Sequence, residues 1–201
     1  MRQLFLLISY IFHPLFVPMA GTIAYFLVTP KYTPLELQSG NILPVFILTI
    51  IIPIISFFIL RNLGVVNSVF LRTQKERIFP LIICIALLLM ILIKVIPNNY
   101  TAELYYFFVG LVAAMASSLL LLFLNFKNSL HMVGMGSFLM YLITLSIHFE
   151  LNIILAISLF TVCTGLVATA RLYLYEHSKA EVLIGLLIGL GSQLLTVKFW
   201  L

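Results

Sequence analysis

Charged residues are scarce in this chain. Of its 201 residues, 8% are charged and 63% are hydrophobic, and the mean hydropathy is +1.22. An ordinary soluble domain carries about 25% charged residues. A water-soluble fold of this length has too small a core to bury so much apolar surface. The composition therefore excludes a typical soluble enzyme, a nucleic-acid-binding module and a disordered segment.

Cysteine is also rare, and the apolar runs lack alternation. The two cysteines, Cys84 and Cys163, both lie in the middle of apolar runs. We interpret them as small buried hydrophobes, which predicts neither a disulfide nor a metal pair. Because the apolar runs are continuous, they do not match the alternating strands of an outer-membrane barrel. What remains is a helical membrane protein with very little chain outside the bilayer.

Seven apolar runs are long enough to cross a membrane, since a span needs about 20 mostly apolar residues. We predict an all-α, polytopic membrane protein with six to seven transmembrane helices in one bundle, forming a single membrane-embedded domain over residues 1–201. The first run holds His13, Pro14 and Pro18, so it is expected to kink or re-enter, with His13 bonded to a carbonyl that a proline leaves free. A six-span alternative omits either this run or the fifth, which is the shortest. The runs cover residues 4–28, 42–60, 79–96, 104–124, 131–147, 151–170 and 182–199.

The basic residues gather on one predicted face of the membrane. With seven spans, the stretches 61–78, 125–130 and 171–181 lie on the same side as the N-terminus. Each stretch precedes a helix, whose free N–H groups and positive dipole end attract anions, and arginine adds donors that fit phosphate oxygens. This arrangement predicts a site for a dense anion at the boundary between water and lipid. Eight of the eleven basic residues lie on this face: Arg2, Arg61, Arg72, Lys75, Arg77, Lys127, Arg171 and Lys179.

The stretch 168–185 carries the most specific pattern. Arg171 is followed six residues later by His177 and four residues after that by Glu181. A carboxylate four residues from a histidine can hold the imidazole in one tautomer, and a neutral, oriented imidazole can attack phosphorus while an arginine holds the phosphate oxygens. The alternative is structural: Ser178 and Glu181 form a capping box, and Arg171 and Lys179 are interfacial anchors.

Two further stretches have both functional and structural interpretations. In the first, Ser129 can donate to a phosphate oxygen and His131 can protonate a leaving alkoxide. The alternative is that Ser129 caps a helix and His131 is an interfacial histidine.

The other stretch, residues 71–80, carries three basic residues. As phosphate ligands these are Arg72, Lys75 and Arg77. The alternative is a solvated loop in which Thr73 and Glu76 form a capping box before the next helix.

Taken together, the three stretches resemble the motifs of the type 2 phosphatidic acid phosphatase superfamily, which includes the lipid phosphate phosphatases and the vanadium haloperoxidases. Those motifs are a lysine six residues before Arg-Pro, then Pro-Ser-Gly-His, then Ser-Arg, five residues, His, three residues and Asp. The resemblance covers about residues 70–190. The corresponding residues are Arg77 and Pro80 for the first motif, Asn128, Ser129, Leu130 and His131 for the second, and Ala170, Arg171, His177 and Glu181 for the third.

The resemblance implies a role for each motif residue. His177 is the expected nucleophile, which forms a phosphohistidine, and Glu181 replaces the aspartate that orients it. His131 is the expected general acid. The superfamily needs no metal or other cofactor. The expected phosphate ligands are Ser129, Arg171 and Arg77, together with Lys75 or Arg72.

We therefore expect an integral membrane phosphatase of phospholipid metabolism that hydrolyses a lipid phosphate or a polyprenyl diphosphate, takes its substrate from the bilayer and binds no nucleic acid. The alternative is a catalytically weak or inactive relative that binds or transports anionic lipid, which the altered first and second motifs favour. The expected location is the inner, or cytoplasmic, membrane of a bacterium. The excess of basic residues favours a cytoplasmic site, whereas bacterial members of the superfamily commonly have a periplasmic one, and the oligomeric state stays open.

Overall fold

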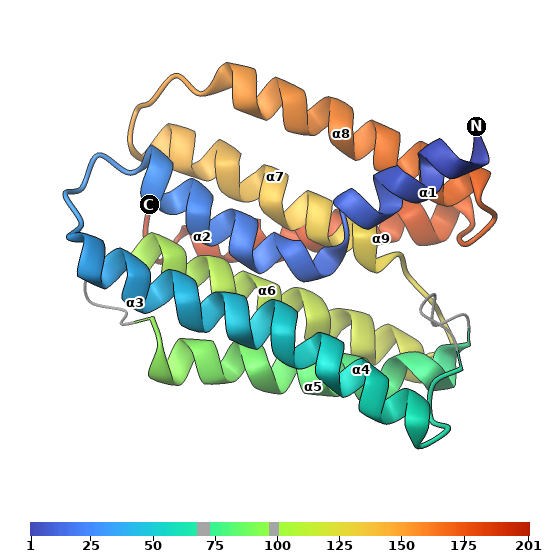
Figure 1. The fold of residues 1–201 in the computed structure, drawn as a ribbon. Coiled ribbons are helices and arrows are strands. Elements are labelled where there is room, and N and C mark those ends of the chain that lie inside the picture. The colour runs from blue at the N-terminus through green and yellow to red at the C-terminus, as the bar shows by residue number, and fades with distance from the viewer. Residues whose placement is uncertain (68–72, 97–100) are drawn as a thin grey trace.

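A computed structural model of the chain describes residues 1–67, 73–96 and 101–201. It is an all-α bundle, and its described part contains seven helical stretches that are long and apolar enough to cross a membrane. Figure 1 shows these helices lying roughly side by side. The helices are α1 (Arg2–Ile11), α2 (Val17–Val28), α3 (Leu35–Phe46), α4 (Ile52–Asn62), α5 (Gln74–Lys94), α6 (Ala102–Phe123), α7 (Leu130–His148), α8 (Ile154–Tyr173) and α9 (Lys179–Val197).

The first span is kinked, as expected, and it crosses the whole bundle. Helix α1 ends at Ile11, and a 3₁₀ turn over Pro14–Phe16 leads into α2. Pro14 has no N–H to donate and disfavours helical geometry in the preceding residue, so the helix breaks at His13. All seven runs form helical stretches that are long and apolar enough to cross a membrane, which agrees with the seven-span prediction.

The second span also contains an irregular turn. Helices α3 and α4 are joined by a π-helical turn over Ile47–Ile51. Pro44 and Pro53 lie on either side of this turn, and both lack the N–H of a regular helix. The sequence of residues 33–36, Thr-Pro-Leu-Glu, resembles a capping box, but Pro34 occupies the N-cap position and no side chain caps the helix.

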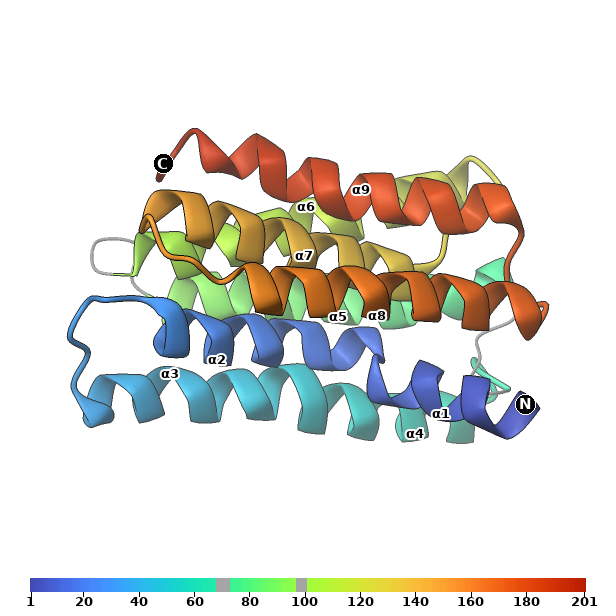
Figure 2. The same ribbon diagram turned by 90° about the horizontal axis from the view of Figure 1, so that it is seen from above.

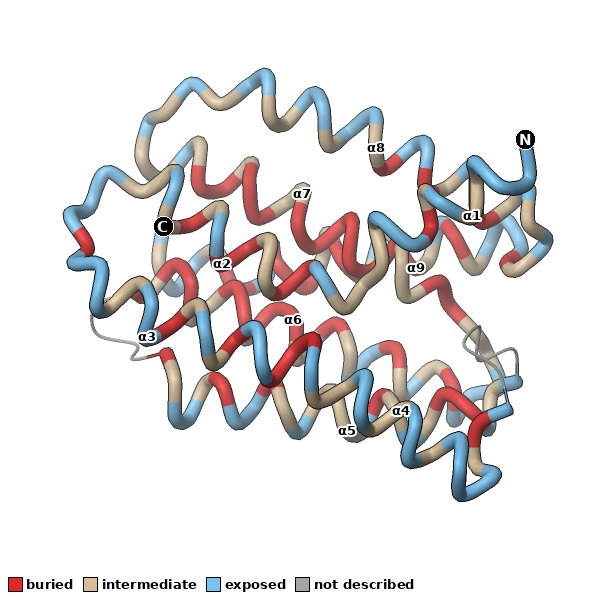
Figure 3. Tube along the Cα trace, viewed as in Figure 1, coloured by how far each residue is buried: buried red, intermediate tan, exposed pale blue. Residues whose placement is uncertain are grey.

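Helix α7 is the most buried of the spans, as Figure 3 shows by its colour. Its largest contact is with α9, where two glycines allow the helices to approach closely. A Cβ atom at Gly185 would lie 2.6 Å from the carbonyl oxygen of Ser129, and one at Gly189 would collide with the carbonyl oxygen of Val133. Close packing at small residues is typical of membrane helices, and here it brings the start of α9 against the start of α7.

The outer surface of the bundle is apolar, as a bilayer requires. Large hydrophobic side chains such as Ile93, Leu155 and Leu195 are mostly exposed, and a soluble monomer rarely exposes such contiguous apolar area. Figure 2 shows the N-terminus near the loop between α8 and α9, and the C-terminus at the opposite end of the bundle. The chain is therefore an integral membrane protein, with the N-terminus and the α8–α9 loop at the same end of the bundle, as seven spans predict.

Candidate active site

The three motif stretches meet at the end of the bundle that carries the N-terminus. The Arg77 guanidinium of α5 donates a hydrogen bond to the carbonyl oxygen of Asn128 at 3.0 Å. The next residue, Ser129, donates its backbone N–H to the carbonyl oxygen of Glu181 at 3.1 Å. These two bonds join the N-terminal ends of α5, α7 and α9, so residues up to 104 positions apart in the sequence surround one region.

His177 and Glu181 form the pair that their spacing predicts. The Glu181 Oε2 atom lies 2.7 Å from His177 Nδ1 and also accepts the Ser178 N–H at 3.2 Å. The capping box is present as well, because the Ser178 hydroxyl accepts the Glu181 N–H at 3.3 Å. The two interpretations of Glu181 are therefore compatible. Since a carboxylate only accepts, Nδ1 carries the ring proton and the lone pair of neutral His177 lies on Nε2.

The surroundings of His177 keep its ring neutral. The residue is 7% exposed, and burial is the main cause that lowers its pKa from 6.5 to about 2. The positive charges of Arg77, Arg171 and Lys127 lower this pKa further. A neutral imidazole with a free Nε2 is the form that a phosphorus nucleophile needs.

Two buried donors in this region have no hydrogen-bond partner among the described residues. They are the Arg171 Nε atom and the Ser129 hydroxyl. Arg171 is 3% exposed, so the interpretation as an interfacial anchor is wrong for it, whereas Lys179 is exposed as an anchor should be. Ser129 occupies the N-cap position of α7, but unlike Ser178 it makes no capping bond with its side chain. Both donors are thus available to an anion.

The first span supplies part of the site, although the resemblance does not extend to it. His131 Nε2 lies 3.0 Å from the carbonyl oxygen of Ser9, and a carbonyl only accepts, so Nε2 carries the proton. The His131 ring also makes an edge-to-face contact with His13, at 5.3 Å between centroids. His13 Nδ1 accepts the Leu15 N–H at 3.3 Å, so its expected bond to a carbonyl is wrong. The intramembrane histidine beside a proline was the one sequence signal for this contact.

The three predicted phosphate ligands of the stretch 71–80 differ in burial, and one of them lies outside the described residues. Lys75 is exposed, whereas Arg77 is buried, because residues two apart point to nearly opposite sides of a helix. Arg72 lies outside the described residues. The capping box of Thr73 and Glu76 is present in full, so at Lys75 the structural interpretation fits better.

From the sequence, Lys127 is expected only to add to the basic residues on one face of the membrane. Its Nζ atom donates to the carbonyl oxygen of Glu176 at 3.1 Å, and its charge acts on His177. It therefore belongs to the positive surroundings of the site.

Comparisons of the chain with known protein families, with curated proteins and with solved structures find no match. The likeness to the phosphatase superfamily therefore rests on the order and spacing of the three motifs.

Proposed function

We propose that this protein is a phosphatase of the bacterial inner membrane that hydrolyses a lipid phosphate or a polyprenyl diphosphate through a phosphohistidine. One observation carries the proposal. The buried Arg171 Nε and Ser129 hydroxyl donors lack partners among the residues that the structure describes, at the same end of the bundle as a neutral histidine that Glu181 orients. Buried polar groups are nearly always hydrogen-bonded, so two unpartnered donors indicate a ligand that accepts hydrogen bonds.

The reaction follows from the roles of these groups. His177 Nε2 attacks phosphorus while Arg171, Ser129 and Arg77 hold the non-bridging oxygens. The bond from phosphorus to the leaving oxygen breaks, and that oxygen takes a proton from His131 or from water. The leaving oxygen belongs to the lipid alcohol in a monophosphate and to the remaining lipid-bound phosphate in a diphosphate. Water then attacks the phosphohistidine, releases inorganic phosphate and restores His177. Charge that develops on the phosphoryl oxygens meets donors that are already in place, which is the main source of catalysis in such a site.

Phosphate release by the purified protein tests the proposal. Wild type should release phosphate from hexadecyl phosphate or farnesyl diphosphate in the presence of EDTA. His177→Gln should lower this rate at least about 1,000-fold, as removal of a nucleophile does. The matched control is His148→Gln, because His148 also contacts a glutamate, at the other end of the bundle. Substantial turnover by a correctly folded His177→Gln protein would contradict the proposal.

A non-catalytic role is the second candidate, and one observation favours it. In a neutral His131 ring the only N–H is directed at the Ser9 carbonyl, so the leaving oxygen finds no proton there unless Nδ1 is also protonated. A protein that binds or transports anionic lipid needs no such proton. Binding of hexadecyl phosphate by wild type without phosphate release would select this second function.

A further inference from the structure

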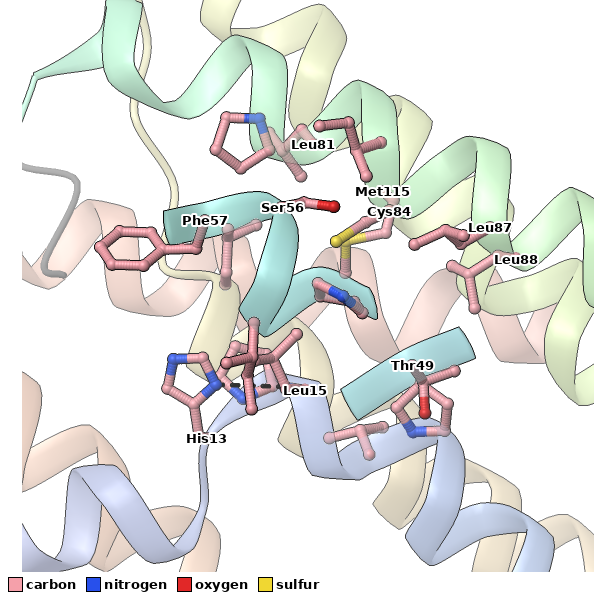
Figure 4. A pocket seen from close by; sticks show the side chains of 18 of the residues that line it. His13, Leu15, Thr49, Ser56, Phe57, Leu81, Cys84, Leu87, Leu88 and Met115 are labelled. Carbon is pink, nitrogen blue, oxygen red and sulfur yellow. Dashed lines mark hydrogen bonds between the residues drawn. The ribbon is translucent and has the colours of Figure 1, made fainter. Parts of the chain in front are cut away.

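An apolar cavity of about 350 Å³ lies beside the candidate active site. Its walls come from the first span, from the π-helical turn and α4, and from α5, α6 and α7. Figure 4 shows many of the side chains that line it, among them Ser56 from α4 and Cys84 from α5, which lie near one another. Ligand cavities in proteins range from about 300 to 1,000 Å³, so this one has room for a ligand.

The cavity has one polar end. Arg77 is the charged residue among those that line it, and His13 lines it as well. Both also belong to the candidate active site, since Arg77 bonds to Asn128 and His13 contacts His131. The apolar space therefore begins where the phosphate ligands end.

The size and the opening of the cavity favour a single hydrocarbon chain. At about 30 Å³ for each water-sized group, the cavity holds about a dozen methylene groups, which is most of one long chain and leaves no room for a second chain of that length. Ile54 and Phe58 of α4 line the cavity and are 42% and 54% exposed. This wall therefore reaches the outer surface, where a longer chain can continue into the bilayer.

His13 is held in one tautomer at the polar end. Its Nδ1 atom accepts the Leu15 N–H at the start of the 3₁₀ turn, as the dashed line in Figure 4 shows. The proton of the neutral ring therefore lies on Nε2. This leaves a fixed, uncharged donor at the junction between the cavity and the phosphate ligands.

We propose that this cavity binds the hydrocarbon chain of a single-chain lipid phosphate, and that His13 Nε2 donates a hydrogen bond to the oxygen that joins the chain to phosphorus. The inference rests on the proposed function for the position of the phosphate. It adds the class of lipid and a substrate-binding residue from the first span.

Cavity-filling variants test the chain site. The probes are hexadecyl phosphate, butyl phosphate and dihexadecanoyl phosphatidic acid, with binding to the detergent-solubilised protein followed by native mass spectrometry. Each buried methylene contributes about fourfold in affinity, so Cys84→Phe and Ser56→Phe should each lower the ratio of hexadecyl to butyl phosphate affinity at least tenfold. Ile82→Phe is the matched control, because Ile82 is exposed on the same helix as Cys84 and should leave this ratio unchanged.

Substitutions of His13 distinguish hydrogen-bond donation by Nε2 from acceptance of the Leu15 N–H by Nδ1. An asparagine oxygen can still accept the Leu15 N–H, but its amide is too short to replace Nε2. His13→Asn should keep the thermal unfolding temperature and bind hexadecyl phosphate about tenfold more weakly, whereas His13→Gln, which extends a donor to the Nε2 position, should recover most of the affinity. Equal affinities for wild type, His13→Asn and His13→Gln would remove His13 from the site.

The outcomes of these experiments test the chain-binding cavity and the phosphatase reaction separately. If wild type binds hexadecyl phosphate, loses it in Cys84→Phe and releases no phosphate, the cavity is correct and the phosphatase is not. If phosphate is released but neither filling variant changes the affinity ratio, the cavity does not bind the chain. Equally tight binding of dihexadecanoyl phosphatidic acid and hexadecyl phosphate would also overturn the single-chain assignment.

Discussion

The two ends of the bundle differ in the sign of their buried charges and in the groups that neutralise them. At the end opposite the candidate site, Glu103 is 2% exposed, and its carboxylate is surrounded by donors. It accepts from the Lys31 ammonium and from the Tyr25 hydroxyl at 3.3 Å, and His148 Nε2 lies 3.2 Å away. The chain itself completes this site.

At the motif end, buried cations predominate. Arg77 and Arg171 are both buried, and Arg171 Nε has no partner in the described part of the chain. Two donors near Glu103, the Tyr141 hydroxyl and Trp200 Nε1, also lack partners within residues 1–67, 73–96 and 101–201, but both are neutral. The charge of Glu176 acts on Arg171, but no described group accepts a hydrogen bond from Nε. An unsatisfied buried donor is costly, so the contrast fits the proposal that an anion from outside the chain completes the Arg171 end.

Replacing Arg171 should produce the largest effect and should move activity and stability in opposite directions. Arg171→Met should lower phosphate release about 100- to 1,000-fold, as loss of a donor to the transition state does. It should also raise the free energy of unfolding of the anion-free protein by about 1–3 kcal/mol, because a poorly compensated buried charge is gone. Arg61→Met is the control, since Arg61 is exposed. A destabilised Arg171→Met protein would mean that Arg171 has a structural partner.

Replacing Glu103 should lower the stability of the protein and leave phosphate release nearly unchanged. Glu103→Leu leaves Lys31 and His148 without their carboxylate, and breaking a buried ion pair costs about 3–5 kcal/mol. Because the Lys31 side chain is 40% exposed, we expect the low end, about 3 kcal/mol, in unfolding by sodium dodecyl sulfate. Phosphate release per folded molecule should be close to wild type. A large loss of turnover in the folded protein would show that the two ends are coupled.

Inorganic phosphate should distinguish the ends without any turnover. A ligand at 100 times its Kd stabilises a protein by about 2.7 kcal/mol, so phosphate should raise the thermal unfolding temperature of wild type. The shift should persist in Glu103→Gln and vanish in Arg171→Met, with sodium chloride of equal ionic strength as the control. An equal shift in both variants would place the anion elsewhere.

The parts of the site that depend on helical spacing were predictable from the sequence. The apolar runs set the spans, and the four-residue spacing of His177 and Glu181 placed them together. The opposite orientations of Lys75 and Arg77 follow from the same periodicity, which allows only one of the two to face the site. Such features need only the local geometry of one helix.

The parts that depend on packing between helices were not predictable. Arg171 and Lys179 both lie near helix ends, and only the contacts of α1 and α7 with α8 decide that one is buried. The contact of His13 with His131 joins residues 118 positions apart, through the kink in the first span. A single sequence carries no signal for such pairings beyond the cost of placing a histidine inside a membrane.

The smallest expected effect concerns the pH dependence of His177. Its folded pKa lies below 6.5, so below pH 6.5 the unfolded chain binds a proton that the folded chain does not, and stability falls as the pH drops. Lys127→Gln removes the weakest of the three positive charges that act on the ring. The pKa of His177 should therefore rise above about 2, and the loss of stability, which extends from pH 6.5 down to about pH 2 in wild type, should level off at a higher pH. Histidine-selective NMR and thermal unfolding across this range measure both quantities, with the exposed Lys179→Gln as the control. A His177 that titrates near 6.5 in wild type would contradict both the burial of the ring and the approach of the three cations to it.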